Sequence, residues 1–225
     1  MNFKAIKIFF LNRKGGTGKS SISREVAILL DILNKNTILV DVDPNGVQSE
    51  VYSGNVISLA PEDRLPFDDN HTYIYDFPGE DDNRVSLVEK CDLVIIPYHP
   101  DFDSLNRTLA TYNFVEKRNK EILLICNTYK NEQKDFEGSI EALEGALDNM
   151  LVVKKLRDSR GMRTAVNNRK SILELYLEGG INKLAYKPLL EELTSIVYAI
   201  LESTDNCNDF ASEADLFKYY INLKV

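Results

Sequence analysis

The chain has few of the residues from which disulfide frameworks and zinc sites are built. Its three cysteines, Cys91, Cys126 and Cys207, are odd in number and far apart, so they make neither a disulfide framework nor a Cys-x-x-Cys metal site. This cysteine usage fits a reducing cytoplasm. Only His71 and His99 offer imidazoles, and two widely separated histidines are too few for a typical zinc site.

Long apolar runs and an excess of positive charge are also missing. No stretch approaches the roughly 18 apolar residues of a membrane span, and residues 1–4 lead straight into an expected strand rather than a signal peptide. The net charge of −8 argues against a general nucleic-acid coat. The charge is spread unevenly, because residues 61–82 carry eight acids against one base and residues 154–170 carry seven bases against one acid.

Apolar runs rich in β-branched residues alternate with helical patterns along the 225 residues, which predicts one α/β domain with a mostly parallel β-sheet flanked by helices. The first helix is expected to begin at Ser20, and a helix with Pro188 in its first turn is expected to continue to residue 201. Residues 202–215 are polar and acidic and predict a linker before a short terminal element. The domain is thus expected at 1–201 and an extension at 202–225. The expected strands are 5–11, 37–42, 72–75, 93–97, 122–126 and 151–153.

A glycine-rich loop follows the first expected strand and opens the first expected helix. It reads Lys-Gly-Gly-Thr-Gly-Lys-Ser, with Arg13 where the common phosphate-binding loop has its first glycine. In such a loop backbone N–H groups converge on a nucleotide phosphate, Lys19 reaches the β- and γ-phosphates, and the Ser20 hydroxyl ligates Mg²⁺. The loop predicts binding of a nucleoside triphosphate. The candidate nucleotide-binding residues are Lys14, Gly15, Gly16, Thr17, Gly18, Lys19, Ser20 and Ser21.

The second lysine makes the loop resemble the deviant Walker A loop of the ParA/MinD family of ATPases, a branch of the P-loop NTPase fold. The resemblance covers about residues 4–201 and is nearest to small plasmid-type ParA proteins without an N-terminal helix-turn-helix domain. It implies that Lys14 reaches across a homodimer interface to the partner's ATP. The alternative is a solvated loop lysine.

Carboxylates at strand ends suit a site for Mg²⁺ and ATP. Asp41 and Asp43 stand in a stretch that resembles the family's Asp-x-Asp-Pro-Gln motif, with Asn45 where glutamine is usual. The resemblance implies that Asp43 orients the attacking water and that Asp41 supports Mg²⁺ or the phosphate loop. The alternative is an Asp-Pro turn at the end of a strand. Asp76, at the end of a later strand, resembles the Walker B carboxylate that contacts Mg²⁺. Asn127 stands where relatives often read the adenine edge, although a turn-forming role is the alternative.

The basic stretch at 154–170 is the predicted DNA-binding surface. It resembles the family's arginine-bearing helix and following turn, with Arg169 in place of the turn's glycine. The alternative is that some of these arginines serve the nucleotide pocket or pair with the acids at 61–82, and Arg157 is the member expected nearest the nucleotide. The candidate DNA-binding residues are Lys154, Lys155, Arg160, Arg163, Arg169 and Lys170.

The resemblance implies a ParA-type ATPase that dimerises on ATP and Mg²⁺, binds DNA non-specifically and positions DNA or another cargo. A ParB-like or other small adaptor protein is the implied partner, in the cytoplasm on the nucleoid and without a membrane. A MinD-like membrane cycle is the first alternative. It needs a basic amphipathic C-terminal helix, and residues 216–225 hold only two bases. An iron–sulfur reductase is the second alternative. It needs cysteines in glycine-rich loops, whereas Cys91 and Cys126 lie in apolar strand contexts.

Overall fold

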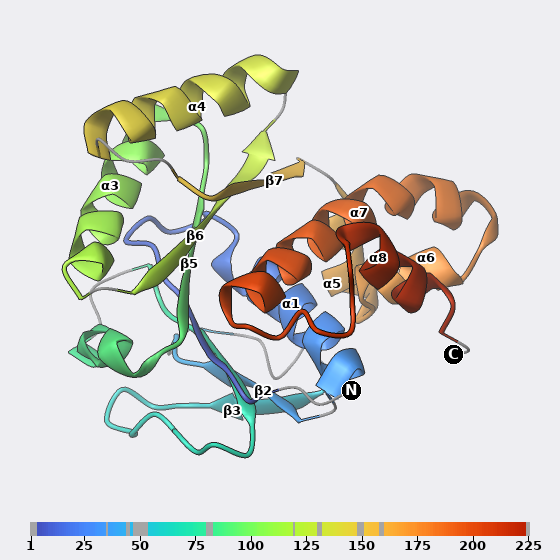
Figure 1. Cartoon of the computed structure of the whole chain (residues 1–225), viewed down its shortest axis with the longest axis horizontal. Coiled ribbons are helices and arrows are strands. Elements are labelled where there is room, and N and C mark those ends of the chain that lie inside the picture. Colours follow the sequence, from blue (N-terminus) through green and yellow to red (C-terminus); the bar gives the residue numbers. More distant parts are fainter. Residues whose placement is uncertain are drawn as a thin grey trace.

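The fold is a seven-stranded parallel sheet between two layers of helices, as a computed structural model shows (Figure 1). The strand order is β3-β2-β4-β1-β5-β6-β7. The strands are β1 (Lys7–Phe10), β2 (Thr37–Asp41), β3 (Asn55–Ser58), β4 (Thr72–Asp76), β5 (Leu93–Tyr98), β6 (Glu121–Tyr129) and β7 (Val153–Arg157). The structure describes residues 4–34, 36–43, 46, 54–79, 83–118, 120–129, 132–147, 151–157 and 160–223.

Helices cover both faces of the sheet. In Figure 1, α3 and α4 lie on one side, and α1, α7 and α8 lie on the other. The helices are α1 (Lys19–Asn34), α3 (Phe102–Glu116), α4 (Glu132–Leu147), α5 (Arg160–Asn168), α6 (Ile172–Leu177), α7 (Gly180–Ser203) and α8 (Glu213–Ile221), with a 3₁₀ helix, η1 (Asn83–Lys90). Among the described residues, none of these helices has both the length and the apolar character that crossing a membrane requires.

The central strands are mainly apolar, and helices cover both of their faces. Along β1, Ile8 and Phe10 belong to the core under α1 and α7, whereas Phe9 belongs to the core under α3 and α4. Alternate residues of a strand point to opposite faces, so one continuous apolar run fills two cores. The parallel sheet predicted from these runs is confirmed.

Three local expectations differ from the structure. The edge strand β3 was not predicted, because Asn55 and Ser58 are exposed and the strand lacks an apolar run. The last strand is Val153–Arg157 rather than residues 151–153. It was missed because its one buried residue, Leu156, stands among charged residues and the strand has no apolar run. Pro188 lies in the middle of α7 and not in its first turn. It is tolerated there although proline removes a helical hydrogen bond.

The C-terminal residues pack on the body of the molecule. The expected linker begins inside α7, which runs to Ser203, and its Phe210 is buried. Helix α8 buries Leu216 and Tyr220, and the Tyr220 hydroxyl donates to the carbonyl of Leu29 in α1 at 3.1 Å. Helix α8 thus packs mainly on α7 and reaches the first helix through Tyr220.

Candidate functional site

The glycine-rich loop joins the carboxyl end of β1 to the first turn of α1. Two of its glycines adopt a backbone that only glycine enters at low cost, with φ of +76° at Gly16 and +90° at Gly18. A Cβ on Gly18 would lie 2.1 Å from the Nδ2 atom of Asn127. The loop therefore depends on glycine both for its curvature and for its contact with β6. Its Thr17 is buried, whereas Gly15, Gly16 and Ser20 are exposed.

Lys19 is folded back onto the loop that precedes it. Its ammonium donates to the backbone carbonyls of Asn12 at 3.2 Å and Lys14 at 3.1 Å. Burial lowers the pKa of Lys19, against the raising effect of the nearby carboxylates of Asp76 and Asp43. Neutral carbonyls are weaker partners for an ammonium than a phosphate anion, so a bound phosphate would draw Lys19 towards itself.

Lys14 stands at the front of the loop and pairs with an acid that the sequence did not single out. Its ammonium forms an ion pair with Asp103 in the first turn of α3, and the Lys14 side chain is 36% exposed. Hydrogen bonding from Lys14 holds the pKa of Asp103 below its usual range. Arg107 lies 3.6 Å from the other oxygen of the same carboxylate.

No histidine was assigned to this site from the sequence. His99 directly follows β5, and its Nε2 atom lies 3.0 Å from the Gly16 carbonyl oxygen, to which it donates. Its place just past a strand at the carboxyl edge of a parallel sheet is the signal that could have drawn attention to it.

The predicted carboxylates gather beside Lys19. Asp41 ends β2 and Asp76 ends β4, the two residues are paired in register, and each is 1% exposed. Asp43 follows β2 and is half-buried. A Cβ on Gly46 would lie 2.1 Å from Asp41 Oδ1, so the backbone approaches this carboxylate closely. The motif's Pro44 and Asn45 lie outside the described residues.

The oxygen donors at this edge fit magnesium bound together with phosphates. Mg²⁺ prefers hard oxygen ligands and usually takes one or two from the protein, with waters and substrate phosphates completing its shell. Asp76 and the Ser20 hydroxyl supply such oxygens at the end of β4 and the start of α1. Within the described ranges, no group of three or more acidic, histidine or cysteine residues could hold a metal ion without such help.

A cavity of about 600 Å³, here called the loop pocket, opens beside the glycine-rich loop. Asn127 is 8% exposed in its wall, and its Nδ2 donates to the Thr17 carbonyl oxygen at 2.8 Å. Asn127 therefore braces the loop, and its role in reading adenine stays a prediction. The pocket is lined by Gly16, Gly18, Ser21, Ile22, Asn127, Arg157, Arg160, Met162, Arg163 and Val166.

The residues of the basic stretch do not share one surface. Lys154 donates to Glu213 of α8 at 2.7 Å and to Ser195 at 3.0 Å, and Lys170 pairs with Glu178 at 2.5 Å. Arg160 and Arg163 line the loop pocket, together with Arg157. Lys155 and Arg169 are exposed.

Arg169 takes the conformation of the glycine that it replaces. Its φ is +53°, in the left-handed region, so the turn that joins α5 to α6 forms in spite of the side chain.

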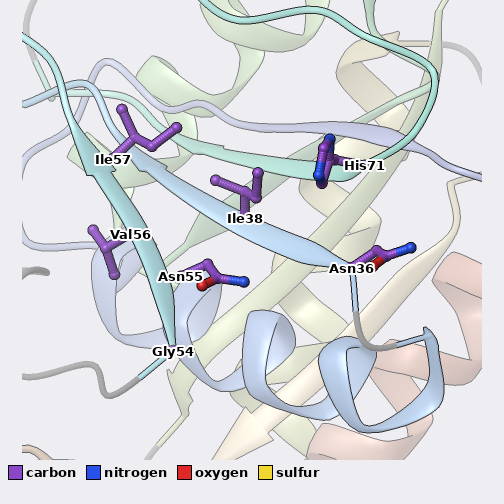
Figure 2. A pocket seen from close by; sticks show the side chains of 7 residues that line it. All are labelled: Asn36, Ile38, Gly54, Asn55, Val56, Ile57 and His71. Carbon is purple, nitrogen blue, oxygen red and sulfur yellow. The ribbon is translucent and has the colours of Figure 1, made fainter.

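A second cavity, of about 550 Å³, lies at the opposite edge of the sheet (Figure 2). Asn36, Asn55 and His71 stand at or just before the amino ends of β2, β3 and β4, and Ile38, Val56, Ile57 and Gly54 complete its lining. The carboxylates and Lys19 stand at the carboxyl ends of the strands, so this cavity takes no part in phosphate chemistry.

A family model matches most of the chain. Residues 8–172 match the family model described as the CobQ/CobB/MinD/ParA nucleotide binding domain. A search of curated proteins found no significant match.

Solved structures share the fold at low sequence identity. The ATP complex of a Cyanothece McdA variant superposes with a TM-score of 0.64 at 14% identity, over 89% of this chain and 98% of that one. A putative plasmid partition protein of Borrelia burgdorferi bound to AMPPNP gives a TM-score of 0.58 at 17% identity, over 88% of this chain and 100% of that one. The MinC:MinD cell division protein complex of Aquifex aeolicus gives a TM-score of 0.60 at 16% identity, over 85% of this chain and 95% of that one.

Proposed function

Because this chain belongs to the ParA/MinD family of nucleotide-binding ATPases, we propose that it hydrolyses ATP with Mg²⁺, forms a homodimer in the ATP state, and positions DNA or another cargo. The observation that carries the proposal is the pair of lysines on one phosphate loop. Lys19 is buried inside the loop, while Lys14 stands half-exposed at its front, where a second molecule can be reached.

Binding begins with the loop. The N–H groups around Gly16 and Gly18 surround the phosphates, and Lys19 leaves the carbonyls of Asn12 and Lys14 for the phosphate oxygens. Ser20 and Asp76 would hold Mg²⁺, with Asp41 in support. When bound, the ion would neutralise charge that develops on the transferred phosphoryl group.

Asp43 is the residue that we assign to the attacking water. It lies close enough to Lys19 for its charge to oppose the lowering of that lysine's pKa by burial, and Lys19 is the residue that we assign to the β- and γ-phosphates. A carboxylate in this place orients a water by accepting its hydrogen bond. Hydrolysis is expected to be slow until a partner stimulates it.

Lys14 is assigned to the partner's nucleotide. Its own loop already has Lys19 for the phosphates, and Lys14 reaches outward to Asp103 rather than inward. In a face-to-face dimer, each Lys14 would add a positive charge to the nucleotide of the other subunit, so that ATP holds the dimer together.

The tail favours a DNA-based or protein-based cargo over a membrane cycle. Leu216 and Tyr220 are buried against the body, so the apolar face of α8 is already used. Its Lys218 lies 3.4 Å from Asp215. A membrane-targeting helix needs a free apolar face flanked by bases.

For DNA we propose the exposed bases Lys155, Arg169 and Lys170 as separate contacts rather than one surface, with Lys170 exchanging Glu178 for a phosphate. Such contacts release counterions, so binding should weaken with salt and show little sequence preference. A small ParB-like adaptor that stimulates hydrolysis completes the proposal.

The deciding experiment measures molecular mass by light scattering with ADP, ATP and no nucleotide. ATP should double the mass of the wild type. Lys14→Ala should bind ATP by calorimetry yet stay monomeric, and Lys183→Ala, which changes an exposed lysine on α7, should behave as the wild type. ATP-dependent dimers that persist in Lys14→Ala would contradict the role given to this lysine.

A further inference from the structure

Three arginines form one wall of the loop pocket. Arg157 ends β7, and Arg160 and Arg163 lie in the first turn of α5, with Met162 and Val166 beside them. The rest of the lining comes from the end of the phosphate loop, the first turn of α1 and Asn127 of β6. Because the pocket adjoins the loop that would hold the phosphates, the ribose and base of the same nucleotide could enter it.

Arg157 is held in this wall by a carboxylate from another element. Glu192 of α7 accepts the Arg157 backbone N–H at Oε2 (2.8 Å), and accepts Nε at 3.0 Å and Nη2 at 2.8 Å through Oε1. The Glu192 side chain is 9% exposed, and a carboxylate buried to this extent is stabilised by donors such as these. Contact with two guanidinium nitrogens and the backbone fixes the plane of the guanidinium group.

The other two arginines project from α5 without such a partner. Arg160 and Arg163 are exposed, and neither forms an ion pair with any residue in the part of the chain that the structure describes. On a chain with a net charge of −8, these three guanidinium groups, one of them paired with Glu192, gather positive charge beside the phosphate loop. Guanidinium groups stack on nucleobases and donate to phosphate and ribose oxygens.

We propose that Glu192 is a positioning residue of the nucleotide site, which fixes Arg157 in an arginine wall that, with Arg160 and Arg163, binds the base and ribose end of the nucleotide. This inference rests on the proposed function. It moves Arg160 and Arg163 from the predicted DNA surface to the nucleotide. It also makes α7 responsive to the nucleotide, because Glu192 contacts the wall directly.

The wall touches the part of the nucleotide that does not react. Loss of the wall should therefore weaken the binding of ADP and of ATP to the same extent, and leave the turnover rate of the bound complex almost unchanged. Loss of a contact to the terminal phosphate, or of a contact across the dimer, would instead weaken the binding of ATP alone.

The first test compares Glu192→Gln with Glu191→Gln. Glu191 is the exposed neighbour on the same helix and lies 3.6 Å from Lys187, so it controls for the loss of one charge on α7. The carboxamide in Glu192→Gln has one acceptor oxygen and cannot serve both the backbone and the side chain of Arg157. Calorimetry should show ADP and a non-hydrolysable ATP analogue each binding about 5- to 10-fold more weakly to Glu192→Gln, with kcat within about twofold of the wild type.

The second test does not depend on a buried residue. Arg163→Ala changes an exposed side chain, and Arg64→Ala removes an exposed arginine from the β3–β4 connection as its control. Arg163→Ala should weaken ADP binding several-fold, and Arg64→Ala should not.

Three results would overturn the inference. A Glu192→Gln protein that melts earlier but binds ADP as tightly as the wild type would reduce Glu192 to a structural role. An Arg163→Ala protein with wild-type ADP affinity and weakened DNA binding would return this helix to the DNA surface. A wild-type protein that binds neither ADP nor ATP would overturn the proposed function itself, and this outcome is distinct from the other two.

Discussion

Lys14 and Asp103 form an ion pair across the front of the phosphate loop although they are 89 residues apart. The same lysine is the one that we assign to the nucleotide of a second subunit. If Lys14 turns to the nucleotide of a second subunit as proposed, it leaves Asp103. We therefore expect this carboxylate to compete with the proposed dimer.

Replacing Asp103 with Asn should make ATP-driven dimerisation easier. Exposed ion pairs are weak because water and salt screen them, so the ATP concentration for half-maximal dimerisation should fall by no more than about fivefold. Light scattering during an ATP titration measures the change. Asp69→Asn is the control, because it breaks the exposed pair with Lys7 at the opposite edge of the sheet. A higher ATP requirement in Asp103→Asn would mean that this carboxylate assists the dimer.

Replacing Asp43 with Ala should separate binding from hydrolysis. Lys19 and the loop glycines are untouched, so ATP affinity should stay within about twofold, while phosphate release should slow by roughly 100-fold or more. Glu62→Ala, which removes an exposed acid from the β3–β4 connection, should hydrolyse ATP as the wild type does. Wild-type turnover in Asp43→Ala would assign the water to another residue.

Replacing Gly18 with Ala should damage the loop in two separable ways. The left-handed backbone at φ +90° costs about 1–3 kcal/mol for a residue with a Cβ, and that Cβ also collides with Asn127. Urea unfolding should show a large loss of stability, and nucleotide binding should disappear. The double variant Gly18→Ala/Asn127→Ala should regain part of the stability, because only the collision is removed.

Gly15→Ala is the control for Gly18→Ala and for the double variant. Nothing lies within 4 Å of the added Cβ, so its stability should stay within about 0.5 kcal/mol of the wild type. Equal losses in Gly15→Ala and Gly18→Ala would mean that the collision with Asn127 is unimportant.

Replacing Arg169 with Gly should stabilise the protein. Relief of the left-handed backbone is worth about 1 kcal/mol, measured as a higher urea midpoint. The matched change Arg163→Gly, inside α5, should instead cost about 1 kcal/mol because glycine is a poor helix residue. A destabilised Arg169→Gly would show that the arginine side chain contributes more than its backbone costs.

The phosphate loop and the central strands were predictable because each is encoded in a short segment. Ile8 to Phe10 is apolar enough to specify a buried strand, and the glycines at 16 and 18 specify the turn that follows. Asp41 and Asp76 could be brought together because neighbouring parallel strands end at the same edge.

The partners of charged residues were not predictable in this way. Arg157 and Glu192 are 35 residues apart, on a strand and a helix whose packing no local pattern specifies. The basic stretch was treated as one surface because its bases are adjacent in sequence. Folding separates them, since Lys154 lies on β7, Arg163 on α5 and Lys170 after a turn.

The contacts of the C-terminal residues with the start of the chain have a consequence for synthesis. The Tyr220 hydroxyl reaches Leu29, and Asn206 Oδ1 accepts the backbone N–H of Lys4 at 2.8 Å. Chains are made from the N-terminus, so a ribosome-bound chain holds a complete phosphate loop before the residues that cover α1 have emerged. The cover that these residues place on α1 therefore forms only after residues 206–220 have left the ribosome, and a chain arrested before that point should expose apolar surface of α1 to chaperones.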